Sequence, residues 1–318
     1  MQTSRPTSGT SATPASATGL SLVVSGGFED YRLIDSGNGR KLERFGKIVV
    51  DRPEPQALWR PLAAPSVWEG AHATFSGDED AESGRWRVAK PVPESWPVRL
   101  GDGVTVTCKL SAFRHLGLFP EQMPHWQWML AALKAQKGSD APRPRVLNLF
   151  AYTGAASLIA ARAGAEVTHV DASKKAIAWA KENQAASKLT DAPVRWMLDD
   201  ARKFIQREVR RNRRYDVILI DPPKFGRGPN NETWDIFEHL PELLRASAEL
   251  VAGPKSAVVL TAYAIRASAL MLDQLSREVL AGKGGRFESG ELALREQDGG
   301  RAVPTSLFTR WSGDDLAI

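Results

Sequence analysis

The stretch RVLNLFAYTGAASLIAARAGAEVTHVDASKKAIAWAKEN, residues 145–183, decides the fold expected for this chain of 318 residues. An apolar run at 146–150 is followed by a helical pattern at 155–163, and the same order returns at 166–170 and 174–186. Strands that alternate with helices of this length form a parallel sheet with helices on both faces. The stretch therefore predicts an α/β unit whose strands end at one common edge.

The alternation continues downstream of this stretch. Further strands are predicted at 194–198, 217–220 and 257–261, and further helices at 201–210, 234–251 and 267–280. The run at 217–220 is apolar throughout, as in strands that are covered on both faces. Segments 286–294 and 305–311 differ, because they are two extended runs joined by a glycine-containing loop. Residues 146–318 thus predict a mostly parallel seven-stranded sheet that ends in an antiparallel C-terminal hairpin.

The region upstream, residues 21–118, is predicted to be a small β-rich domain. Its expected strands lie at 31–34, 47–50, 85–88 and 104–110, with turn signals at 36–39 and 102–103. In the last strand apolar and polar residues alternate, which places Cys108 on a buried face. A helix and a breaker-rich linker, residues 119–145, connect the two domains.

The composition excludes several classes of protein. Cys108 is the only cysteine, so an internal disulfide and a cysteine-ligated zinc or iron–sulfur site are excluded, which fits a cytoplasmic protein. No apolar run is long enough to cross a bilayer. Residues 1–20 lack the basic start and apolar core of a secretory signal, and their Ser, Thr, Ala and Pro content predicts a disordered leader.

The carboxyl ends of the first two predicted strands carry the first candidate site residues. The loop NLFAYTGAAS, 148–157, places backbone N–H groups at the sheet edge where such folds bind ligands, and Gly154 permits close approach of the backbone. One glycine, where a dinucleotide loop has three, argues against a pyrophosphate cofactor. Asp171 ends the second strand, where its carboxylate can accept hydrogen bonds from ribose hydroxyls. The alternative role of Asp171 is to cap the helix that follows it.

The next two strand ends also carry carboxylates. Of the pair Asp199-Asp200, one is expected to cap the following helix, and Asp200 is assigned to the amino group of an adenine. The fourth strand leads into YDVILIDPPKFGRGP, 215–229. Two consecutive prolines form a rigid corner with outward carbonyls, which beside Asp221 can hold a planar base or an amino group. A plain strand-terminating turn is the alternative interpretation.

The motifs VLNLFAYTGAAS, VDASKKAIAWAKEN, LDDARKF and YDVILIDPPKF occur in this order within residues 145–261, and together they resemble class I S-adenosylmethionine-dependent methyltransferases. More narrowly they resemble the family that methylates bases of 23S ribosomal RNA, at cytosine C5 or guanine N7. The resemblance implies a Rossmann-like domain with S-adenosyl-L-methionine as its cofactor. The residues implied to bind the cofactor are Gln122, Phe150, Tyr152, Thr153, Gly154, Asp171 and Asp200. The residues implied to line the acceptor, with a catalytic role, are Asp221, Pro222, Pro223 and Lys224.

The sequence departs from the family pattern at several positions. Asn148 stands where an acid is common, and Phe150 and Tyr152 stand where many class I enzymes have glycine. Cysteine is absent near the Asp-Pro-Pro turn and after the fifth strand, which argues against a covalent C5 mechanism. Direct transfer of the methyl group to a base nitrogen is therefore expected.

The charge of the chain favours an anionic partner. The net charge is +5, and RNA, ribosomal RNA in particular, is the expected partner, with no membrane and no metal. Phe225 and Arg227 adjoin the acceptor corner and are assigned to substrate binding. The basic residues between 202 and 214 have two interpretations, a phosphate grip or the solvated face of one helix, and the second is favoured. The histidines are scattered and are expected to be packed or exposed rather than metal ligands.

The function expected from these residues is methylation of a base nitrogen of ribosomal RNA, by direct in-line transfer from S-adenosyl-L-methionine. The first alternative is a methyltransferase that acts on a protein or a small molecule. Less favoured are a nicotinamide-dependent oxidoreductase on a similar sheet and a non-catalytic RNA-binding protein. The last would require Phe150 and Tyr152 to have closed the cofactor pocket.

Overall fold

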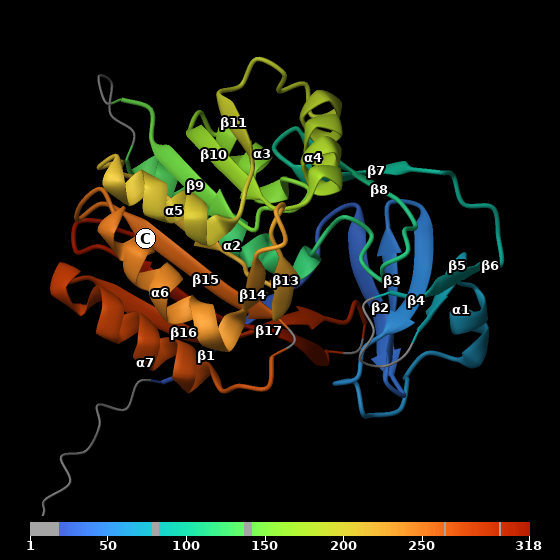
Figure 1. Cartoon of the computed structure of the whole chain (residues 1–318). Helices are drawn as coiled ribbons and strands as arrows, with labels where there is room; N and C mark the ends of the chain where they lie inside the picture. Colours follow the sequence, from blue (N-terminus) through green and yellow to red (C-terminus); the bar gives the residue numbers. More distant parts are fainter. Residues whose placement is uncertain (1–18, 78–82, 137–141, 264, 299) are drawn as a thin grey trace, which may run out of the picture.

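The computed structural model of the chain describes residues 19–77, 83–136, 142–263, 265–298 and 300–318. Most of the predicted leader, residues 1–18, and part of the predicted linker, residues 137–141, lie outside the described residues. Figure 1 shows a large α/β layer structure beside a smaller β-rich part.

The large layer structure is built on one eight-stranded sheet. In spatial order its strands are β1 (Ser21–Ser25), β16 (Arg286–Arg295), β17 (Ala302–Ser312), β15 (Ala257–Tyr263), β12 (Val217–Ile220), β9 (Arg145–Leu149), β10 (Glu166–Asp171) and β11 (Val194–Leu198). Only β17 runs antiparallel to its neighbours; all the other described pairs are parallel. The expected mostly parallel sheet with an antiparallel C-terminal hairpin is confirmed.

The eighth strand, β1, corrects the expected strand number and the expected limit of the N-terminal domain. Residues 21–25 were placed in the β-rich domain, yet they pair in parallel with Gly290–Leu294 of β16 and cover the hairpin edge. Gly290 makes this approach possible, because a Cβ there would lie 1.8 Å from the backbone oxygen of Ser21. The pairing depends on a contact between the two ends of the chain, which no local pattern reveals.

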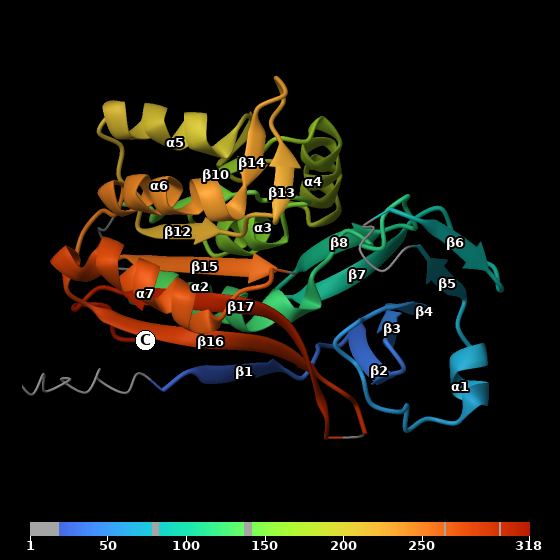
Figure 2. The same cartoon turned by 60° about the horizontal axis from the view of Figure 1, so that its bottom comes forward.

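Helices cover both faces of the sheet (Figure 2). One face carries α2 (Met123–Ala135), α3 (Ala155–Arg162) and α4 (Lys174–Ala186), and the 3₁₀ turn η1 (Pro120–Gln122) leads into α2. The other face carries α5 (Ala201–Arg210), α6 (Ile236–Glu249) and α7 (Ala269–Leu280), with the 3₁₀ turn η2 (Ala281–Lys283) after α7. Two apolar cores, one for each face, hold these layers together.

The β-rich part contains a five-stranded sheet and a separate hairpin. The sheet consists of β2 (Tyr31–Gly37), β3 (Arg40–Phe45), β4 (Ile48–Pro53), β5 (Ala73–Ser76) and β6 (Arg85–Val88), and the hairpin of β7 (Trp96–Gly101) and β8 (Val104–Cys108). A short helix, α1 (Pro65–Glu69), lies before β5. The turn residues Asn38-Gly39 and Asp102-Gly103 have φ between 47° and 75°, as two-residue hairpin turns require. Cys108 is fully buried, as its place in the alternation predicts.

The β-rich part and the α/β part share one apolar core rather than packing as separate bodies. The hairpin β7–β8 lies against α4, where the Trp179 Nε1–H donates to the Thr107 carbonyl at 2.7 Å. On the opposite side, Arg301 next to β17 pairs with Asp35 of β2 at 2.8 Å. The two parts therefore contact each other at two separate places, β7–β8 with α4 and Arg301 with β2.

Candidate active site

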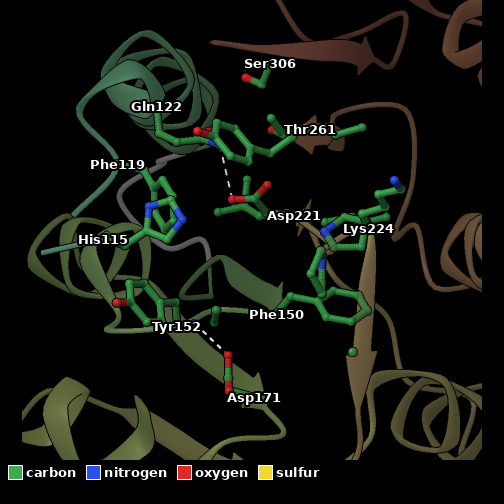
Figure 3. A pocket seen from close by; sticks show the side chains of 18 of the residues that line it. His115, Phe119, Gln122, Phe150, Tyr152, Asp171, Asp221, Lys224, Thr261 and Ser306 are labelled. Atoms are coloured by element: carbon green, nitrogen blue, oxygen red, sulfur yellow. Dashed lines mark hydrogen bonds between the residues drawn. The ribbon is translucent and has the colours of Figure 1, made fainter. Parts of the chain in front are cut away.

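A cavity of about 1310 Å³ lies at the carboxyl ends of the parallel strands (Figure 3). Its volume exceeds the roughly 300–1,000 Å³ of pockets that hold one small molecule. Its wall combines strand ends with Glu54–Gln56 of the β-rich part and 304–307 of β17. All the predicted site residues except Gly154 line it: Gln122, Phe150, Tyr152, Thr153, Asp171, Asp200, Asp221, Pro222, Pro223, Lys224, Phe225 and Arg227.

Gly154 is absent from the lining of the cavity and stands where α3 packs against α4. It stands at the N-cap of α3 with φ of 84°, a left-handed conformation that favours glycine. A Cβ at this position would lie 3.1 Å from the Cβ of Ala180 in α4, so its open side faces the interior. The left-handed conformation and the close packing both favour glycine here, and its role at the cofactor stays a prediction.

The loop after β9 is held in a strained backbone conformation. Phe150 and Tyr152 have φ of 57° and 50°, which bulky residues adopt at a cost of about 1–3 kcal/mol. The backbone N–H of Tyr152 donates to Asp171 Oδ2 at 2.8 Å, and this bond fixes the loop against the end of β10. Aromatic side chains thus replace glycines here without closing the cavity.

Asp171 faces the cavity from the end of β10 and is not the cap of α4. That cap is Ser173, whose Oγ accepts from the Ala176 N–H at 3.2 Å. Asp171 Oδ1 accepts from the Ser173 N–H at 2.8 Å, and burial raises the pKa of the carboxyl while its two backbone donors lower it. Because each carboxylate oxygen can accept more than one hydrogen bond, Asp171 retains acceptor capacity toward the cavity.

The two acids after β11, Asp199 and Asp200, do not have the roles expected from the sequence, because Asp200 rather than Asp199 caps α5. Asp200 is the N-cap of α5, and its Oδ1 accepts from the Lys203 N–H at 2.9 Å. Asp199, expected as the other candidate cap, forms an ion pair with Arg207 instead. Both line the cavity, so the strand end is acidic, but one oxygen of Asp200 is already occupied by the helix.

Asp221 lies centrally among the labelled side chains in Figure 3 and accepts a hydrogen bond from Gln122 Nε2 at 3.1 Å. Burial, and secondly the carboxylate of Glu121, raise the pKa of Asp221 from 3.8 to about 7. Glu121 is itself buried at the cavity wall. The carboxyl of Asp221 therefore changes between neutral and charged forms near neutral pH.

The Asp-Pro-Pro corner is fixed by Trp234, which the sequence did not identify. The Trp234 Nε1–H donates to the Pro223 carbonyl at 2.7 Å, and its ring lies 4.9 Å from that of Phe150. Trp234 belongs to a small hairpin, β13 (Phe225–Arg227) and β14 (Thr233–Asp235). Of the two proline carbonyls expected to face a substrate, that of Pro223 is already engaged within the protein.

Several other residues that line the cavity were not predicted from the sequence. His115, Phe119 and Tyr263 form an aromatic group with ring centroids 4.7–6.1 Å apart. His115 was expected to be merely packed or exposed, yet it lines the cavity. Tyr263 could have been found, because it ends β15 at the edge where the other site residues lie. Ser306 could not, because its place depends on the pairing of β17, which sets Ser306 opposite Tyr263.

The basic residues near α5 are mostly engaged with carboxylates, which supports the favoured interpretation of a solvated helix face. Arg202 pairs with Glu242 at 2.8 Å and Lys203 with Glu232 at 2.7 Å. Arg207 and Arg211 are also paired. Within the ranges that the structure describes, no group of three His, Cys, Asp or Glu residues is placed to hold a metal ion, and no helix is both long and apolar enough to cross a membrane.

Comparisons with known proteins agree with this geometry. A family described as "Conserved hypothetical protein 95" matches residues 130–257. The crystal structure of a SAM-dependent methyltransferase from Agrobacterium tumefaciens is 52% identical, with a TM-score of 0.87 over 92% of this chain and 93% of that one. SMU.776, assigned as a methyltransferase and complexed with SAH, shares the fold at 19% identity, with a TM-score of 0.68 over 88% of this chain and 75% of that one.

A curated relative matches a shorter part of the chain. The Ribosomal RNA large subunit methyltransferase K/L of Shewanella frigidimarina is 39% identical over 116 residues, which is 36% of this chain. The match spans 16% of that relative's own length.

Proposed function

The chain belongs to the S-adenosylmethionine-dependent methyltransferases, and from that premise we propose that it methylates a base nitrogen of ribosomal RNA by direct in-line transfer. Its cofactor is S-adenosyl-L-methionine. One observation supports the proposal above the others: Asp171 and Asp221, from two different strand ends, line one cavity that is larger than a cofactor needs. We also propose that the enzyme acts in the cytoplasm, where ribosomal RNA is available to it.

The residues of the cavity fit the cofactor by their chemistry. When bound, S-adenosylmethionine supplies a methyl group on a positively charged sulfur. Asp171, Asp200 and Asp221, at the carboxyl ends of β10, β11 and β12, bring carboxylates to one cavity and favour a ligand that carries positive charge. The carboxylate of Asp171 accepts hydrogen bonds from the ribose hydroxyls through the lone pairs that the N–H groups of Tyr152 and Ser173 leave free. Asp200 approaches the adenine with its remaining oxygen, and Gln122, Phe150, Tyr152 and Thr153 enclose the amino-acid end.

The acceptor corner positions the base to be methylated. Asp221 accepts a hydrogen bond from the base, and Gln122 fixes the orientation of the carboxyl from the other side. The carbonyl of Pro222 is the second acceptor, since that of Pro223 is bonded to Trp234. Well-oriented reactants gain roughly 7–11 kcal/mol from alignment alone, so a ring nitrogen with a free lone pair needs no general base. Lys224 and Phe225 border the same corner.

A nitrogen is favoured over cytosine C5 because the chain has no nucleophilic thiol at the cavity. Cys108 is the only cysteine, is fully buried in β8 and does not line the cavity. Burial also raises the pKa of its thiol, so a thiolate is disfavoured.

The other functions considered are less well supported. Phe150 and Tyr152 leave the cavity open, which disfavours a protein that binds RNA without catalysis. Because the chain belongs to the methyltransferases, the alternative of a nicotinamide-dependent oxidoreductase is not favoured. The ribosomal RNA methyltransferase among the relatives favours RNA over a protein or small-molecule acceptor.

The test is transfer of tritium from methyl-labelled S-adenosylmethionine to ribosomal RNA isolated from cells that lack the gene. We expect label in large-subunit RNA, recovered after nuclease digestion as a base methylated on nitrogen. Asp171→Ala is expected to lose binding of S-adenosylhomocysteine in calorimetry, whereas Asp191→Ala, on the surface, is the matched control. Label that appears only in protein, or on a carbon of the base, would overturn the proposal.

A further inference from the structure

Four cations line the cavity: Arg114, Lys224, Arg227 and Arg266, which we call the cleft rim. None of them has a carboxylate partner among the residues that the structure describes. Arg227 and Arg266 are exposed. The guanidinium of Arg114 lies 5.9 Å from the ring centroid of Tyr263, and Lys224 Nζ lies 5.1 Å from that of Phe225. Unpaired cations at a cavity are available to an anionic ligand.

The acids of the same cavity are mostly buried. Glu121 and Asp200 are buried, and Asp171 and Asp221 are largely buried; the exposed Glu291 is the exception. The cavity is therefore acidic in its interior and basic where it meets solvent. Such a distribution suits a cationic cofactor inside and a polyanion outside.

Aromatic side chains accompany these cations on two separate segments. Phe113 is 52% exposed next to Arg114, and Phe225 is 60% exposed next to Lys224, and both phenyl groups line the cavity. Exposed aromatic rings beside cations are the combination that binds single-stranded nucleic acid, with bases stacked on the rings and phosphates held by the charges.

The basic residues at the end of α5 provide an internal comparison. Arg213 and Arg214 are exposed and lie in the loop that leads into β12, at the edge of the sheet opposite the strand ends. They do not line the cavity. They match Arg227 and Arg266 in charge and exposure but differ in place.

We propose that the cleft rim binds the phosphate backbone of a single-stranded RNA segment, so that an unstacked base can enter the cavity toward Asp221. The proposal rests on the proposed function, because it names how that substrate is held. The cleft rim, and not the basic residues between 202 and 214, is then the phosphate-binding surface. Bases must leave the stack to reach a buried reactive group, which is why an unpaired segment is required.

Salt dependence measures phosphate contacts directly. Each phosphate neutralised on a single strand contributes about 0.7 to the slope of log Kd against log salt. Removing two rim cations should lower that slope by about 1.4. Removing two cations elsewhere should leave it unchanged, apart from the small effect of net charge.

The experiment compares the double variant Arg227→Gln/Arg266→Gln with the double variant Arg213→Gln/Arg214→Gln. The probe is a fluorescein-labelled oligouridine RNA, titrated by anisotropy at several KCl concentrations in the presence of S-adenosylhomocysteine. Equal affinity of all three proteins for S-adenosylhomocysteine, measured by calorimetry, establishes that both variants are folded. We expect weaker binding and the smaller slope only for the rim variant.

Equal slopes for the three proteins, or an equal loss in both variants, would overturn the rim proposal. So would a failure of the wild-type protein to bind the oligonucleotide at the lowest KCl concentration. The two proposals can fail separately. Methylation of ribosomal RNA with unchanged slopes refutes the rim alone, whereas the expected slopes without any label in ribosomal RNA refute the proposed function and leave the rim as a polyanion site.

Discussion

Replacing Asp221 by Asn should make the folded protein more stable at pH 8. Burial and Glu121 raise the pKa of Asp221 from 3.8 to about 7, and unfolding returns it to its ordinary value. Between these two pH values the unfolded chain binds fewer protons than the folded one, so the stability of the wild-type protein falls as pH rises. At 1.36 kcal/mol for each pKa unit, the full cost above pH 7 is about 4 kcal/mol.

The size of the effect depends on pH in a defined way. Well below pH 3.8 the carboxyl is neutral in both the folded and the unfolded state, and its burial costs nothing. At pH 5 the ionisation of Asp221 costs about 1.6 kcal/mol, and at pH 8 it costs the full amount. The difference in free energy of unfolding between Asp221→Asn and the wild type should therefore widen by about 3 kcal/mol from pH 5 to pH 8. Asn carries no charge at any of these pH values, and its carbonyl can still accept from Gln122 Nε2.

Urea unfolding at pH 5 and pH 8, followed by tryptophan fluorescence, measures this gap. Glu121→Gln is the second variant, because removing the Glu121 charge lowers the pKa of Asp221 and should narrow the gap while burial preserves part of it. A stability difference between Asp221→Asn and wild type that is the same at both pH values would refute the reasoning. So would a variant that loses stability relative to wild type as pH rises.

Two further substitutions test the packing of the site. Gly154→Ala should lower the free energy of unfolding by about 2–4 kcal/mol, because alanine is strained in the left-handed conformation and its Cβ is overpacked against Ala180. Gly164 also has a positive φ, of 94°, but a Cβ there has nothing within 4 Å. Gly164→Ala should therefore cost only about 1–2 kcal/mol, and urea unfolding measures both losses. Equal losses would show that Ala180 is not the obstacle. Trp234→Phe keeps a ring against Phe150 but removes the N–H donor to the Pro223 carbonyl. The free energy of unfolding should therefore fall by about 0.5–1.5 kcal/mol. The kcat of methyl transfer should also fall, with little change in KM for the cofactor. An unchanged kcat would show that this bond does not position the corner.

Elements with strong local signals could be predicted from the sequence. The helices α4 and α5 have the predicted bounds residue for residue. Each begins at a side-chain cap, Ser173 and Asp200, which makes the start of a helix visible in the sequence. The parallel strands were found because apolar runs covered on both faces stand out between such helices. The edge that collects the site residues then follows from the order of the elements.

Elements that depend on distant partners could not be predicted. β1 forms only because β16 returns beside it at Gly290. β3 was missed for another reason: its sequence, RKLERF, buries Lys41 and Glu43, so the charged residues that normally mark an exposed face are inside. Arg52 pairs with Glu43 at 2.6 Å, and Lys41 with Glu54 at 3.1 Å. A hydrophobic pattern cannot reveal a strand whose interior face is satisfied by ion pairs.

The same buried charges connect the β-rich part to the carboxyl of Asp221. Burial raises the pKa of Glu121, and the nearby positive charges of Lys41 and Arg52 oppose that rise and favour its ionised form. Ionised Glu121 in turn raises the pKa of Asp221. Buried ion pairs are weak evidence for stability as such, but Lys41 and Arg52 also act on the charge of Glu121 at the cavity wall. The protonation of Asp221 is therefore set partly by a sheet that contributes no residue to the family's motifs.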